Sequence, residues 1–146
     1  MKKLYFLILV LLVSSCSVKV QEINYGEDLC HFCKMGIVDK AHASQLVTTK
    51  GKNFKFDAIE CMINFLSESK ADQSQYAFIL VSNLSEPGKM ISAQEATFII
   101  SKDIPSPMGA FLSAVQNKEQ ASVILKESKE AMLYQWDNVQ GKIKKH

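Results

Sequence analysis

The sequence lacks a basic segment of the kind that nucleic-acid-binding proteins use to follow phosphates. Without Lys2 and Lys3, residues 16–146 carry 15 basic and 15 acidic side chains. The only cationic run is at residues 142–145, and such a run is typical of a frayed, solvated chain end. Because a nucleic-acid surface needs clustered positive charge, we expect no nucleic-acid partner.

The sequence also lacks the motifs of common enzymes. It shows no phosphate-binding loop, no Ser-His-Asp set and no pair of carboxylates in an acid–base motif. Its acidic residues are scattered, as on solvated faces and at helix caps. These absences favour a binding or delivery protein over an enzyme.

The first 16 residues predict export and lipidation. Lys2 and Lys3 precede an uncharged apolar stretch over residues 4–13, which is typical of a signal peptide and too short to span a membrane. Small residues then lead to Cys16, as in a bacterial lipobox, where the cysteine becomes the lipidated first residue. We expect a signal peptide over 1–15, a lipidated tether over 16–28 and one folded domain over 29–146. The alternative is an ordinary signal peptide with an incidental cysteine.

Four cysteines are present, and lipidation of Cys16 would leave an odd number. An odd number argues against a framework of disulfides. Two of the remaining three belong to the segment Cys30-His31-Phe32-Cys33-Lys34-Met35-Gly36, which gathers two thiols, an imidazole and a thioether. Sulfur donors of this kind suit monovalent copper.

Three other uses of the segment fit the sequence less well than copper binding. A Cys-x-x-Cys pair can exchange disulfides, but it usually begins a helix, and here a strand is expected to follow. A structural zinc site needs four ligands, and no second Cys-x-x-Cys or Cys-x-x-His pair is present. Haem attachment needs a histidine after the second cysteine, where Lys34 stands. Envelope thiol–disulfide chemistry is therefore the leading alternative, followed by a structural lipoprotein with an incidental sulfur cluster.

Hydrophobic patterns predict an α+β domain made of two strand–helix units. The first unit has strands at 36–40, 43–49 and 54–56, and a helix that Asp57 and Glu60 begin as a capping box. A buried strand follows at 76–81, and Pro87-Gly88 marks a loop over 83–88. The second unit has strands at 95–101 and 108–115, a helix capped by Asn117, and a final strand and short helix after residue 131. Each unit contains a Met-Gly pair.

The candidate copper ligands follow from these placements. Cys33 and Met35 are two residues apart, so an extended chain directs both side chains to one face. Met108 is a candidate third ligand if the two Met-Gly pairs lie side by side, although a buried core methionine is the commoner outcome. Cys30 and His31 are possible further ligands. We expect Cys61 to be a small buried hydrophobic residue and His42 to lie at the surface or at a strand edge, neither of them as a ligand.

The lipobox, the Asp-x-Cys-x-x-Cys-x-Met-Gly segment from Asp28 to Gly36, and Pro107-Met108-Gly109 together resemble the NosL family. These are copper-binding accessory lipoproteins of nitrous oxide reductase maturation. The resemblance implies a lipid-anchored, periplasm-facing Cu(I) metallochaperone in the cell envelope, with nitrous oxide reductase or its assembly machinery as partner. It also implies Cys33, Met35 and Met108 as ligands and a fold similar to that of organomercurial lyase. Family members often have glycine where this chain has Lys34.

Overall fold

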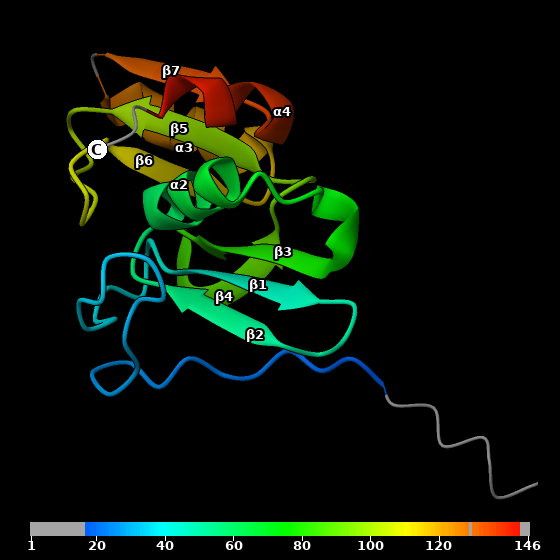
Figure 1. The fold of residues 1–146 in the computed structure, drawn as a ribbon. Helices are drawn as coiled ribbons and strands as arrows, with labels where there is room; N and C mark the ends of the chain where they lie inside the picture. Colours follow the sequence, from blue (N-terminus) through cyan, green and yellow to red (C-terminus); the bar gives the residue numbers. More distant parts are fainter. Residues whose placement is uncertain (1–16, 129, 144–146) are drawn as a thin grey trace, which may run out of the picture.

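The computed structural model describes residues 17–128 and 130–143, so the predicted signal peptide and Cys16 lie outside the described residues. Regular structure alternates between antiparallel strands and short helices along the chain (Figure 1). The elements are β1 (Ser44–Thr48), β2 (Asn53–Phe56), α2 (Ile59–Ser69), η1 (Gln73–Gln75), β3 (Tyr76–Asn83), β4 (Glu86–Ser92), β5 (Thr97–Ser101), β6 (Leu112–Val115), α3 (Lys118–Glu127), β7 (Ala131–Tyr134), α4 (Trp136–Val139) and η2 (Gln140–Lys142).

The described strands form two antiparallel sheets. The first has the order β2-β1-β3-β4 and the second the order β6-β5-β7. Helix α2 follows β1 and β2 in the chain, and α3 follows β5 and β6. The arrangement confirms the predicted α+β class and single domain.

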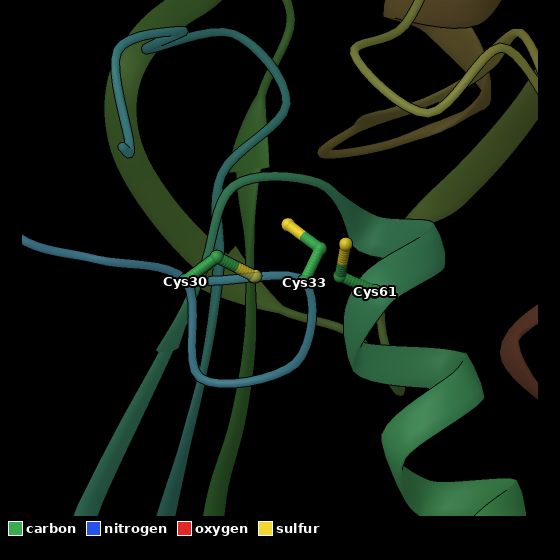
Figure 2. Close-up of side chains that lie close together, drawn as sticks. All are labelled: Cys30, Cys33 and Cys61. Carbon is green, nitrogen blue, oxygen red and sulfur yellow. The ribbon is translucent and has the colours of Figure 1, made fainter. Parts of the chain in front are cut away.

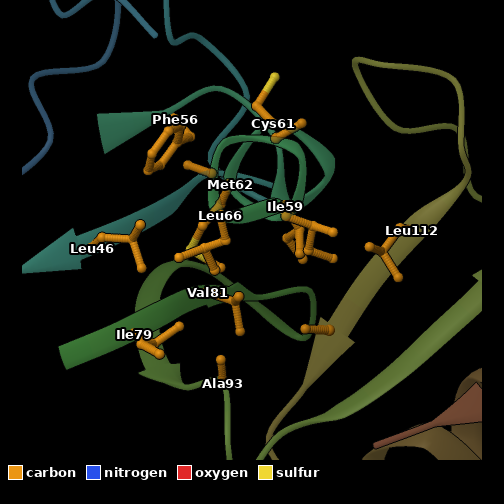
Figure 3. Close-up of a cluster of buried hydrophobic side chains, with 14 of the residues drawn as sticks. Leu46, Phe56, Ile59, Cys61, Met62, Leu66, Ile79, Val81, Ala93 and Leu112 are labelled. Carbon is orange, nitrogen blue, oxygen red and sulfur yellow. The ribbon is translucent and has the colours of Figure 1, made fainter. Parts of the chain in front are cut away.

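Helix α2 lies between the two sheets and contacts β1, β2 and β6 (Figure 1). The side chains of its first two turns are buried on nearly every side, as expected for a helix covered by two layers, whereas residues 67–69 at its end are exposed. Figure 3 shows its apolar residues between the strands of the first sheet and Leu112 of β6. One hydrophobic cluster therefore includes residues of both sheets and of the helices, among them Leu46, Phe56, Met62, Ile79, Phe98, Leu112 and Trp136.

The first helix begins differently from the prediction. Its N-cap is Ala58, which makes no side-chain cap, so the expected capping box of Asp57 and Glu60 is wrong. Both acidic side chains are buried instead of facing the helix end from solvent. The second helix begins as predicted, because the Asn117 side chain accepts a hydrogen bond of 2.9 Å from the Gln120 amide.

Two strand predictions and one loop prediction need correction. Residues 36–40 make only an isolated bridge, between Leu29 and Gly36. The predicted loop at 83–88 contains the start of β4, which is an edge strand and therefore tolerates Pro87. The strand predicted from residue 108 begins only at Leu112, because positive φ angles of 74° at Gly109 and 58° at Phe111 turn the chain before it.

Candidate metal centre

The Cys30–Met35 segment forms a closed loop. The Cys30 amide donates a hydrogen bond of 2.7 Å to the Met35 carbonyl, and the Lys34 amide donates one of 3.0 Å to the Cys30 carbonyl. The His31 amide donates to the Lys55 carbonyl of β2 at 2.8 Å, which fixes the loop against the first sheet. The backbone therefore holds both cysteines of the motif in defined positions.

Three thiols meet where this loop faces the first turn of α2. The sulfur atoms of Cys30, Cys33 and Cys61 all lie within 4.8 Å of one another (Figure 2). Cys30 and Cys61 are fully buried, whereas Cys33 is partly exposed. The three are free thiols. Such a set can hold a soft metal ion, with Cys33 on the accessible side.

The three thiols differ in pKa. The Cys61 thiol, together with the backbone amides of Asp57, Cys33 and Phe32, holds the pKa of Cys30 well below its ordinary value, although burial opposes this. The same interaction with Cys30, and then burial, raises the pKa of Cys61 strongly. Burial raises the pKa of Cys33. Cys30 is therefore the thiol that ionises first and Cys61 the one that keeps its proton longest.

The two predicted methionine ligands occupy different environments. Met35 is 56% exposed at the end of the Cys30–Met35 loop. Met108 is partly buried and packs against the hydrophobic cluster that contains Cys30 and Cys61. The structure thus brings Cys30 and Cys33 together, places Met35 at the surface of their loop, and sets Met108 against the same core. The ligand roles of both methionines stay predictions.

His31 rests on aromatic rings next to the loop. Its ring centroid lies 4.6 Å from that of Phe54 and 5.2 Å from that of Phe65, both in edge-to-face arrangements. Burial of part of the ring, then the charges of Lys34 and Lys52, lower the pKa of His31. The imidazole is therefore neutral at neutral pH, the form in which a histidine binds metal. Its role as a ligand stays a prediction.

His42 was predicted at the surface or a strand edge, and this prediction is wrong. The side chain is only 4% exposed. Its Nδ1 lies 2.8 Å from a carboxylate oxygen of Asp39, and its Nε2 lies 3.0 Å from the Ser113 hydroxyl. No Ser-His-Asp set is recognisable in the sequence, yet the fold assembles one. Because Ser113 is fully buried in β6, its hydroxyl is closed to a substrate, and the set ties the segment before β1 to the second sheet.

Sequence reasoning missed the position of Cys61 and the two buried acids near it. Asp57 and Glu60 are 2% and 1% exposed, and each has one carboxylate oxygen without a hydrogen-bond partner in the described structure. Burial raises the pKa of both carboxyls. The only sequence signal for Cys61 was the third, unpaired cysteine, since its helical spacing is that of a core residue. The acids looked like a helix cap.

Replacing Lys34 by glycine is expected to stabilise the loop. Lys34 has a φ of 66°, which costs an ordinary L-residue about 1–2 kcal/mol and costs glycine nothing. After allowing for the greater freedom of glycine in the unfolded chain, the free energy of unfolding should rise by about 0.5–1 kcal/mol. Denaturant titration measures it. Lys34→Ala removes the same amine but keeps the strain, so equal stability of the two variants would contradict the explanation.

No helix in the part of the chain that the structure describes is long and apolar enough to cross a membrane. A comparison with curated protein sequences found no match. Among solved structures, the fold is similar to that of the copper chaperone NosL from Shewanella denitrificans. That similarity has a TM-score of 0.70 and 21% identity, and covers 84% of this chain and 96% of the other. The NosL family model matches residues 22–143. The chain therefore belongs to the NosL family.

Proposed function

We propose that this protein is a Cu(I)-binding metallochaperone that delivers copper for the assembly of nitrous oxide reductase. The observation that carries the proposal is the meeting of three free thiols between the Cys30–Met35 loop and α2. Membership of the NosL family and the likeness to a solved copper chaperone support the same conclusion. The cargo is an ion held for transfer, so the site needs no catalytic group.

The donor set favours Cu(I) over zinc. Thiolates and thioethers are soft donors, and Cu(I) accepts two to four of them, whereas a structural zinc ion takes four ligands from cysteine, histidine or carboxylate. Cys30 and Cys33 supply anionic sulfur in this proposal, and Met35 and Met108 supply neutral thioethers. Neutral donors bind without losing a proton and release the ion more readily, which suits a delivery protein.

The cellular placement is part of the proposal. Lipidation at Cys16 would anchor the protein in a membrane of the cell envelope, with the copper site facing the periplasm. In the predicted tether, the Lys19 carbonyl accepts a hydrogen bond of 3.1 Å from the Asn53 side chain of β2, and the Gln21 carbonyl accepts one of 2.9 Å from the Gln45 side chain of β1. The tether thus leaves the domain from the β2 side of the first sheet, which would set how the anchored domain faces the membrane.

Metal competition tests the proposed cargo. Under reducing conditions, the form lacking residues 1–16 is expected to bind about one Cu(I) per chain because its donors are soft. Titration against a Cu(I) chelator measures the affinity, and a parallel zinc titration supplies the comparison. Tighter retention of Zn(II) than of Cu(I) would reject the cargo. Transfer of copper to copper-free nitrous oxide reductase in the presence of the chelator tests the recipient.

Met108→Leu separates a ligand from a core residue. The change conserves volume and apolarity, so the free energy of unfolding should fall by less than about 1.5 kcal/mol. If Met108 binds the ion, Cu(I) affinity should fall and X-ray absorption should show one fewer sulfur neighbour. Met132→Leu, which removes an exposed thioether on β7, is the matched control. Unchanged affinity with a normal melting curve would reject Met108 and leave the thiols in place.

A further inference from the structure

Glu60 is an acidic residue in an unusual place. It is buried in the first turn of α2, next to Cys61, and forms no ion pair in the described part of the chain. Burying a carboxyl group without a charged partner costs stability. A residue that carries such a cost in a domain core usually has a specific task.

The contacts of Glu60 lead to one segment. Its Oε1 accepts a hydrogen bond from the Ser106 hydroxyl. Ser106 is itself buried, and it lies two residues before Met108 in the chain. The Glu60 carboxylate therefore holds the start of residues 106–112, the segment that contains Met108.

The backbone of this segment is strained. Phe111 has a φ of 58°, a conformation that a bulky side chain rarely adopts. The Ser101 amide donates a hydrogen bond of 3.1 Å to the Phe111 carbonyl, and the Gly109 amide donates one of 3.0 Å to the Ser106 carbonyl. Strain of this kind persists only where surrounding contacts determine the conformation, and it is common at ligand-binding sites.

We propose that Glu60 is a positioning residue that holds the Met108 turn against the helix turn bearing Cys61. Glu60 and Cys61 are adjacent in α2, so the acid ties the 106–112 segment to the element that carries one of the three thiols. Figure 3 shows Leu112, at the end of this segment, facing the α2 turn on which Cys61 and Ile59 lie. This inference rests on the proposed function, because the held thioether matters only if copper binds there.

Variants of Glu60 test the inference. Leucine in Glu60→Leu is apolar and accepts no hydrogen bond, so amide exchange at residues 108–111 should become faster in the metal-free protein. Cu(I) affinity should fall by about tenfold or more, the loss seen when outer partners of metal ligands are removed. Glu60→Gln keeps an acceptor for Ser106 and should restore both properties. Ser106→Ala removes the donor of the same hydrogen bond, and it replaces Glu60→Leu in this test if that variant does not fold.

A double variant distinguishes positioning from a general loss of stability. In a Met108→Leu background, Glu60→Leu should cause no further loss of Cu(I) affinity, since the thioether that it positions is already gone. Gln73→Ala, which removes a hydrogen bond of 2.8 Å to the Trp136 indole, is the stability control and should leave copper affinity unchanged. Additive losses of Cu(I) affinity in the double variant, or normal affinity in Glu60→Leu, would overturn this inference but not the proposed function. Failure of the unaltered protein to bind Cu(I) would overturn the proposed function with it.

Discussion

Cys33→Ser is expected to lower the Cu(I) affinity by more than about 100-fold, since even outer partners of metal ligands are worth about 10–100-fold. The change replaces a soft sulfur with a hard, neutral hydroxyl on the accessible side of the thiol cluster. Cys30→Ser should cause a comparable loss, because Cys30 is the thiol that ionises first. Chelator competition under reducing conditions measures each affinity.

Cys61→Ser is the matched comparison for these two variants. Its thiol lies in the same cluster but keeps its proton longest, so it should contribute less to binding. Melting curves must accompany the titrations, because all three residues contribute to a packed core. A loss in Cys61→Ser as large as that in Cys33→Ser, with normal stability, would show that all three thiols act as equal ligands.

Oxidation is expected to abolish Cu(I) uptake by the metal-free protein. With oxidised glutathione, the partly exposed Cys33 thiolate attacks one sulfur and releases one reduced glutathione. The Cys30 thiolate then displaces the second glutathione and forms the Cys30–Cys33 disulfide. The product lacks both anionic donors, and reduction should restore binding in full. Mass spectrometry of the oxidised protein and a Cu(I) titration before and after reduction check the result.

The choice of disulfide partners can be tested separately. Cys61→Ser should still lose Cu(I) uptake on oxidation, whereas Cys30→Ser should stop at a mixed disulfide with glutathione. Retention of copper by the fully oxidised protein would contradict the predicted ligands. Catalysis of disulfide exchange on a model substrate would instead favour the envelope redox alternative.

The local part of the site could be predicted from sequence, and the long-range part could not. Cys30, Cys33 and Met35 are within one short segment, so spacing alone places them together. Cys61 joins them only because α2 packs against their loop, and helical spacing could not distinguish this cysteine from its apolar neighbours. The buried position of His42 depends on its contact with Ser113, which is 71 residues away in the chain. No local pattern predicts such a pair.

The fold shows the same division. The strand and helix types were predictable from periodicity, but boundaries depended on tertiary contacts. Pro87 and Gly88 looked like a turn because nothing local indicates that β4 is an edge strand. Asp57 and Glu60 fit a capping box in sequence, but packing between the sheets buries both side chains. The α+β class was robust because it depends on many residues, whereas each boundary depends on few.

The position of α2 has a consequence for how the cargo is retained. The helix is covered by both sheets, and it carries one thiol of the cluster together with the acid that reaches the Met108 turn. Neither sheet can separate without exposing the same helix, so the domain should unfold in a single cooperative transition. Bound copper should add its binding energy to that whole transition and raise the melting temperature with metal concentration. Partial opening of one half of the domain would then rarely release the ion. Transfer would instead proceed by ligand exchange at the exposed side of the Cys30–Met35 loop.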